Sequence, residues 1–380
     1  MSSITYFSQN KIISATNLIL FLLVVPKIDI INFKNFHQGI RIENIFSLIF
    51  FFIILFNRKK FIINYDYKFY LFCGIIFLSY AVGIFNNVSV NLLVFARIFE
   101  YIIFVLFFSN YKLDYRKIII FFKFLILINV IVCLLQYNEL IGFFSSRGYF
   151  GPDYNHWKAA GVFSGSWELS FISSVLYFVI YHHEKKKINI YFFLTLMILY
   201  LANTRGVMIS FFVSLFFLYF RNFKISILQF FILPLIVYAF YFLTLKYFSL
   251  DITILLESLI RLIFFNQNMF EDLSNTGNQY YSWAYRLADW SVYANEFNKN
   301  IITNLFGTGY TAIYYESFLF RILFANGIVG LVILSILILR IKFYMIIFLL
   351  LTGFTLDFVV SFKMFVILFL YFRCLQFLKK

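Results

Sequence analysis

The sequence predicts an all-α protein that crosses a membrane about twelve times. Of its 380 residues, 63% are hydrophobic and 24% are aromatic, and the mean hydropathy is +0.87. A soluble globular chain is usually close to half apolar. Apolar runs near the roughly 20 residues needed to cross the hydrocarbon core recur from end to end. They show no strand-like alternation, so we expect spanning helices.

The individual spans follow from hydropathy and from the charged loops between them. The first apolar run begins near Ile12 and has no small-residue cleavage site, so we expect a retained helix rather than a signal peptide. All spans together are expected to form a single transmembrane domain over residues 1–380. The expected spans are 12–31, 41–56, 69–86, 92–109, 117–136, 161–181, 188–202, 205–220, 225–248, 314–339, 343–357 and 358–374.

Basic residues predict the orientation of these spans. With twelve spans, the clusters all fall on one side, which the positive-inside rule makes cytoplasmic together with both termini. The formal charge of +15 therefore reflects topology, and no nucleic-acid partner is expected, because the basic residues are scattered in short loops. The clusters are at residues 57–60, 111–117, 182–187, 221–224, 340–342 and 377–380.

Two connections on the opposite, outer side are longer than turns. Residues 137–160 contain Gly, Ser and aromatic residues, and residues 249–313 form a large outer loop between the ninth and tenth spans. A loop of about 65 residues in a compact protein is usually functional. Within it, residues 251–265 are amphipathic, which is typical of a helix lying in the membrane interface.

Arg205 is the first charged residue of interest on the outer side. It lies in "LANTRGVMIS" (201–210), a short polar turn at an expected helix start. Free backbone N–H groups and the helix dipole favour an anion at such a position. The alternative is an arginine that extends to the membrane surface for solvation alone.

The second is Arg286, in "SWAYRLADWSVYANEFNKN" (282–300). If this segment is helical, Arg286, Trp290, Tyr293 and Phe297 share one face. An aromatic stripe of this kind usually serves packing. An arginine that continues the stripe brings a fixed positive charge to the face that meets the protein or the membrane.

The third is Glu316, in "YYESFLFRILFANGIVG" (314–330). A carboxylate in the first turn of a helix is stabilised by the dipole, which is the simpler explanation. Arg321 is five residues further on, so we expect each of the two charges to have a separate partner. Asp357, at the outer turn between the last two spans, is positioned to join such a site.

Glu168 lies in "GVFSGSWELSF" (161–171), where glycine and serine permit close backbone approach. Small residues that serve helix packing explain this segment equally well. The sequence contains no P-loop, GxGxxG, HExxH or GxSxG element, and the three cysteines have no close pairing. We therefore expect neither a metal nor a cofactor.

Fixed guanidinium groups at an outer membrane face suit an anion that approaches from within the bilayer, such as a lipid pyrophosphate. In glycosyl transfer from a polyprenyl pyrophosphate, charge grows on the leaving pyrophosphate, and arginines stabilise it without a metal. Glu316 is able to accept a hydrogen bond from the hydroxyl of an acceptor sugar.

The long outer loop, the "NTRGVMIS" turn, the "YRLADW" segment and "YYESFLFRILFANGIVGL" together resemble the O-antigen polymerase (Wzy) and O-antigen ligase superfamily over roughly residues 160–335. This resemblance implies a GT-C-like fold, a bacterial cytoplasmic membrane location and metal-independent transfer with inversion at the donor anomeric carbon. It also implies that Arg205 and Arg286 bind the lipid pyrophosphate.

The ligase branch carries a His-Asn pair where this chain has Glu316 and Ser317, so the resemblance favours the polymerase branch. A carboxylate near two arginines is expected to have a lowered pKa, which leaves open whether Glu316 is a base or orients the acceptor. The expected catalytic residues are Glu316, Arg286 and Arg205, and the expected substrate-binding residues are Arg205, Arg286, Arg321, Trp290, Tyr315 and Glu168.

The expected partners are an undecaprenyl-pyrophosphate-linked oligosaccharide, the lipid bilayer and, by family resemblance alone, a chain-length regulator. Two alternatives to a polymerase stay open. One is an O-antigen ligase, and the other is a flippase or transporter of lipid-linked oligosaccharides. A flippase should line a central cavity with charges from several spans and does not need a large outer loop.

Overall fold

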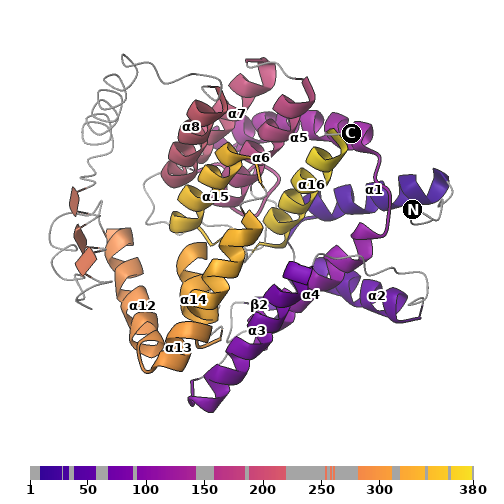
Figure 1. The fold of residues 1–380 in the computed structure, drawn as a ribbon. Coiled ribbons are helices and arrows are strands. Elements are labelled where there is room, and N and C mark those ends of the chain that lie inside the picture. The colour runs from indigo at the N-terminus through magenta and orange to yellow at the C-terminus, as the bar shows by residue number, and fades with distance from the viewer. Residues whose placement is uncertain are drawn as a thin grey trace. The chain divides into compact units, whose positions relative to one another are not determined.

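The computed structural model shows a chain that is predominantly helical over its described residues, with a β-hairpin after the first helix (Figure 1). It describes residues 9–27, 29–33, 38–56, 67–88, 92–142, 158–184, 188–219, 253–254, 257–258, 260–261, 281–309, 317–338, 341–357 and 361–378. Over these ranges the elements are α1 (Gln9–Val24), β1 (Asp29–Phe33), β2 (Gln38–Arg41), α2 (Ile42–Phe56), α3 (Tyr67–Phe85), α4 (Leu92–Ser109), α5 (Tyr115–Tyr137), α6 (Ser166–Glu184), α7 (Ile190–Ala202), α8 (Arg205–Tyr219), α12 (Tyr281–Phe297), α13 (Ile301–Phe306), α14 (Phe318–Ile338), α15 (Phe343–Thr355) and α16 (Phe362–Leu378).

Most of the spans expected from hydropathy correspond to a helix. Two stretches in the described chain, Tyr115–Tyr137 and Phe318–Leu337, are long and apolar enough to cross a membrane, and several shorter apolar helices accompany them. The helical architecture is therefore confirmed, and it is compatible with a helical membrane protein. The number of spans and their orientation stay predictions, and the expected span 225–248 lies outside the described residues.

The first span is shorter than expected, and a hairpin follows it. Helix α1 ends at Val24. Pro26 accounts for this end, because a proline disfavours helical geometry in the residue before it and cannot donate a backbone hydrogen bond. Strands β1 and β2 pair antiparallel, with Asp29 opposite Arg41. The helix expected over 12–31 therefore ends seven residues early, at Val24. The prediction of an all-α chain is corrected by the β-hairpin that follows.

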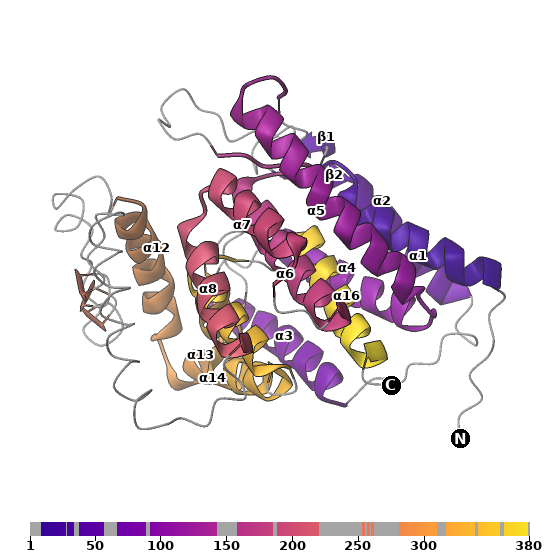
Figure 2. The same cartoon turned by 90° about the horizontal axis from the view of Figure 1, so that it is seen from above.

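The chain divides into two compact units, and each is described by itself. The first unit comprises Met1–Tyr65, Leu93–Phe212 and Phe358–Lys380. Its central element is α6, which packs against α5, α7 and α16 (Figure 2). Every residue of α6 from Glu168 to Ile180 is buried, as expected for a helix that is covered on all sides.

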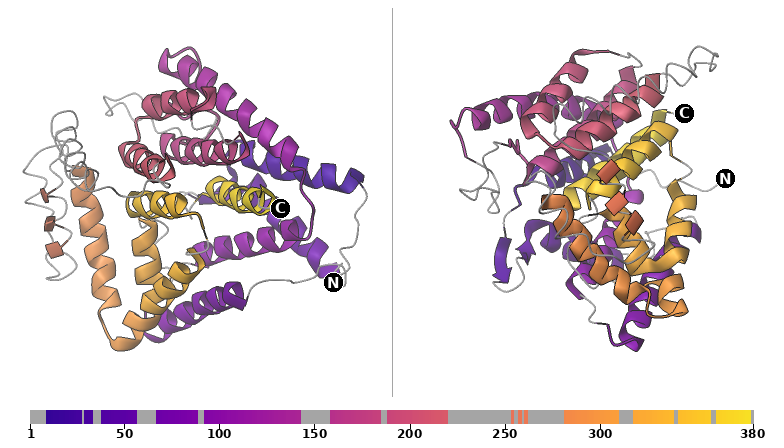
Figure 3. Two further views of the ribbon diagram at one scale, coloured as in Figure 1. Left: turned by 45° about the horizontal axis from the view of Figure 1, so that its top comes forward. Right: turned by 90° about the vertical axis from the view of Figure 1, so that its left-hand side faces the viewer.

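The second unit comprises Asp66–Leu92 and Val213–Asp357. Its central element is α14, which packs against α3, α12, α13 and α15 (Figure 3). Helix α14 is interrupted at Gly327, where φ is 71° and ψ is −174°. The unbroken helix expected over 314–339 is corrected accordingly. That the two units form one transmembrane domain stays a prediction.

Candidate functional site

The residues expected at the site are divided between the two units. Glu168 and Arg205 belong to the first unit, and Arg286, Trp290 and Arg321 belong to the second. Tyr315 and Glu316 lie outside the described residues. Each unit therefore holds one group of candidate side chains.

In the first unit, two amide side chains of α5 hold the segment that leads into α6. Gln136 Oε1 accepts hydrogen bonds from the backbone N–H groups of Ala160 (3.0 Å) and Gly161 (2.9 Å). Asn129 Oδ1 accepts one from Val162 N (3.0 Å). Both side chains are fully buried. Gly161 has φ +59°, and a Cβ there would lie 2.3 Å from Asn129 Oδ1, so this position requires glycine.

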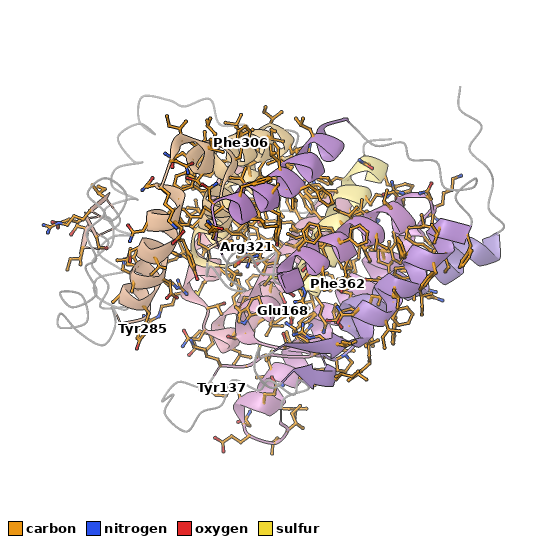
Figure 4. The ribbon with its side chains drawn as sticks, turned by 90° about the horizontal axis from the view of Figure 1, so that it is seen from below. Tyr137, Glu168, Tyr285, Phe306, Arg321 and Phe362 are labelled. Atoms are coloured by element: carbon orange, nitrogen blue, oxygen red, sulfur yellow. The ribbon has the colours of Figure 1, made fainter. Side chains whose placement is uncertain are left out.

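Glu168, in the first turn of α6, is fully buried and joins the starts of two helices. Its Oε2 accepts from Ser164 N (2.9 Å) and from Ser164 Oγ (2.5 Å). Its Oε1 accepts from the hydroxyl of Ser361, the residue before α16. Figure 4 labels Glu168 together with Phe362, the first residue of α16. The carboxylate therefore uses both oxygens on neutral donors.

Two lysines act on this carboxylate. Lys27, between α1 and β1, and Lys363, in the first turn of α16, both interact electrostatically with Glu168. The Nζ atom of Lys363 lies 5.2 Å from the centroid of the Phe163 ring. The Nζ atom of Lys27 lies 5.9 Å from the Trp167 ring. The start of α6 thus combines a buried carboxylate, two ammonium groups and two aromatic faces.

A second charged group lies near the hairpin of this unit. Arg41 at the end of β2 is 2% exposed and pairs with Glu43 of α2 at 3.6 Å. Asn44 Nδ2 donates to Glu100 Oε1 at 2.6 Å. Neither Lys27 nor Arg41 was predicted from the sequence as part of a site. They carried a usable signal, because basic residues on the predicted outer side go against the positive-inside rule.

Arg205 is exposed at the first position of α8. The turn before it is tight, since Asn203 has φ 47° and its N–H caps α7 on the carbonyls of Leu199 and Tyr200. The hydroxyl of Thr204 donates to Ser170 Oγ of α6. The helix start expected at Arg205 is confirmed, and its turn is bonded to the same helix that carries Glu168.

In the second unit, residues 281–297 form helix α12, which meets the condition on which the shared face around Arg286 was expected. The buried face differs from the expected stripe: Trp290 and Phe297 are buried, whereas Arg286 and Tyr293 are only partly buried. The buried residues of α12 are Ala284, Leu287, Trp290, Ser291, Ala294 and Phe297.

Trp290 joins α12 to α14. The centroid of its ring lies 4.3 Å from the ring centroid of Phe320 and 5.5 Å from that of Trp283. The exposed fraction of Trp290 is 0%. Packing therefore accounts for Trp290 in this structure, and a role in substrate binding stays a prediction. Of the interfacial helix expected over 251–265, the few described residues are helical, and Ser258 Oγ accepts from Trp283 Nε1 at 3.0 Å.

Arg321, in the first turn of α14, is 1% exposed, and its Nε lies 2.6 Å from Asp357 Oδ2. Ser317 Oγ donates to the carbonyl of Gly353 at 3.0 Å, which also joins α14 to the end of α15. Asp357 is thus a partner of Arg321, whereas the expectation that Glu316 and Arg321 have separate partners stays a prediction, because Glu316 lies outside the described residues. Figure 4 labels Arg321.

The described residues include no group of three or more His, Cys, Asp or Glu side chains that is able to hold a metal ion. Comparisons with protein-family models, with curated proteins and with solved structures find no match for this chain.

Proposed function

We propose that this chain is a polysaccharide polymerase of the O-antigen polymerase (Wzy) type. In this proposal it is a GT-C-like protein with about twelve spans in a bacterial cytoplasmic membrane, with both termini in the cytoplasm. It transfers a growing glycan from polyprenyl pyrophosphate to a lipid-linked repeat unit at the outer face. The observation that carries the proposal is the set of motifs around Arg205, Arg286 and Glu316.

Two structural features support roles for the arginines. Arg205 is exposed at the start of α8, where the helix dipole adds to its positive charge. Arg286 lies at the edge of the buried face of α12, and Trp290 fixes that helix by packing one turn further on. A guanidinium held at the edge of a packed helix is preorganised to meet an anion.

The proposed reaction is a single displacement. A hydroxyl of the incoming repeat unit attacks the anomeric carbon of the donor sugar, and the bond from that carbon to the pyrophosphate oxygen breaks. Arg205 and Arg286 stabilise the charge that develops on the leaving pyrophosphate. Glu316 accepts the hydrogen bond of the attacking hydroxyl, and either orients it or takes its proton. The anomeric configuration inverts.

A gene deletion tests this proposal. Cells that lack the gene should carry surface glycan truncated at one repeat unit on a gel ladder. A complete absence of glycan would favour a flippase instead, and full-length polymer that accumulates on the carrier lipid would favour a ligase. Either of those two outcomes contradicts the polymerase.

Complementation of the deletion then tests the arginines. Arg205→Ala and Arg286→Ala should each lower chain extension by about 10² to 10³, the usual effect of removing one group that stabilises transition-state charge. Arg261→Ala is the matched control, because Arg261 is partly exposed and forms an ion pair with Glu257, four residues earlier in the sequence. Membrane insertion should be normal in all three variants. Wild-type glycan ladders from Arg205→Ala and Arg286→Ala would show that these arginines have no role in the reaction and only extend to the membrane surface for solvation.

A further inference from the structure

Lys363 is buried without a hydrogen-bond acceptor. Its side chain is 5% exposed, and within the described ranges its Nζ has no hydrogen-bond partner. Its contact with the Phe163 ring supplies part of the stabilisation that water would give. An ammonium group has three N–H donors, and taking them out of water without acceptors is unfavourable.

Glu168, the carboxylate that acts on Lys363, does not supply that acceptor. It binds Ser164 and Ser361 through both of its oxygens, so its charge reaches Lys363 electrostatically and without a hydrogen bond. Lys363 and Glu168 are therefore buried near each other without a hydrogen bond between them. The N–H donors of Lys363 are left without an acceptor among the described residues.

The surroundings of Lys363 are suited to a negative charge. Helices α6 and α16 both begin here, and their partial positive charges add to those of the lysines. Among the described residues, the charged side chains that interact in this region are four basic and three acidic, an excess of one positive charge. They are Lys27, Arg41, Arg97 and Lys363 with Glu43, Glu100 and Glu168.

We propose that the starts of α6 and α16 form a binding site for a phosphate-type oxyanion, with Lys363 as the principal ligand and Lys27 as a second cation. The site is distinct from the arginines of the proposed reaction, and it needs no catalytic activity. Its occupant is a phosphate group in a molecule with net negative charge, either an anionic bilayer phospholipid or a non-bilayer phosphate compound, and the zwitterionic headgroup of phosphatidylcholine is not such a ligand.

The test uses the full chain in phosphatidylcholine nanodiscs, with inorganic pyrophosphate as the probe. Titrations are run in the R205A/R286A background, so that failure of the proposed catalytic site does not affect the result. Pyrophosphate should bind and raise the temperature of unfolding, because a ligand of the folded state stabilises it. K363M in this background should weaken binding by about tenfold or more, whereas K363R should retain it.

K123M is the matched control for the loss of a lysine. Lys123 of α5 also lies over an aromatic ring, 5.4 Å from the Tyr191 centroid, but it forms an ion pair with Glu184. K123M should leave pyrophosphate binding within about twofold of its background, because a separate site contributes independently. The unfolding temperature of K363M without pyrophosphate is the reference for its own titration, because this substitution removes an ammonium group without an acceptor and also one of the two lysines that act on Glu168.

Nanodiscs that contain phosphatidylglycerol identify the source of the phosphate. If they raise the unfolding temperature of the R205A/R286A protein but not that of its K363M variant, the occupant is a bilayer lipid headgroup. If only pyrophosphate does so, the occupant is a non-bilayer phosphate. Equal behaviour of K363M and its parent with both probes would overturn the proposal.

Discussion

Arg321 fits two roles that the sequence does not separate, binding of substrate and a structural ion pair. It was expected to bind substrate, and it lies in a buried ion pair with Asp357 that joins α14 to the end of α15. Breaking a buried pair by removing one partner is strongly unfavourable, whereas replacing both partners with apolar residues is often tolerated. This difference allows the two roles to be tested.

Arg321→Met should lower the stability of the protein by about 3–5 kcal/mol, because it removes the guanidinium that pairs with the buried Asp357 carboxylate. The double variant R321M/D357L should recover most of that loss. Thermal unfolding in detergent measures both. An unchanged unfolding temperature in R321M would show that the ion pair has no structural role.

The glycan ladder of the double variant then decides the second role. If stability and chain extension both return, Arg321 acts only through packing. If stability returns while extension stays lost, the pair of Arg321 and Asp357 has a role beyond packing, as expected for a substrate-binding Arg321 that Asp357 joins.

At the scale of elements, α14 differs from its prediction by a break inside the helix. Its apolar length predicted one continuous span, but the helix is broken at Gly327. The break frees the carbonyls of Phe324 and Ala325, which accept hydrogen bonds from the N–H groups of Thr308 (3.0 Å) and Gly309 (3.0 Å). These bonds join the end of α13 to the middle of α14.

Gly327→Ala should destabilise the protein. The backbone there has φ 71°, and a Cβ would lie 2.3 Å from the carbonyl oxygen of Leu305. Backbone strain alone is expected to contribute about 1–3 kcal/mol. The measurement is again thermal unfolding in detergent.

Gly74→Ala is the control, because a Cβ at Gly74 in α3 meets nothing within 4 Å. This substitution should be neutral or stabilising by up to about 1 kcal/mol, as for glycine in a helix interior. Equal unfolding temperatures for both variants would contradict the account of the break.

The sequence predicted helices well where apolar length and charged ends agree, as in α4 and α5, whose bounds match the expected spans closely. For the segment around Arg286 it gave only the face that a helix would present, and this segment does form α12. It did not predict the hairpin after α1 or the break in α14, because both depend on hydrogen bonds between residues that hydropathy does not relate.

The candidate site shows the same limit. Glu168 was identified from its sequence context, but its link to Ser361 spans most of the chain and has no local signal. The missing acceptor of Lys363 likewise appears only when α6 and α16 are packed together.

At the scale of the whole molecule, the proposal depends on orientation. The orientation of the spans is predicted from the clusters of basic residues. Loops on opposite sides of the membrane should therefore differ in whether an impermeant reagent reaches them from outside the cell. Lys299, after α12, is predicted to be outside, and Lys112, between α4 and α5, is predicted to be in the cytoplasm. Both side chains are exposed in the structure.

Single-cysteine variants test this orientation after the three native cysteines, which form no disulfide, are replaced. K299C should react with a membrane-impermeant maleimide in intact spheroplasts. K112C should react only after permeabilisation. The reverse pattern would place the proposed site on the wrong face for a polymerase.

The most direct test of the central claim is polymerisation by the purified protein in liposomes. Given a polyprenyl-pyrophosphate-linked repeat unit and a metal chelator, it should form products of two or more units and release polyprenyl pyrophosphate. R286A should form none at the same protein concentration. Failure of the wild-type protein to extend its cognate repeat unit, or extension by R286A at the wild-type rate, would contradict the account.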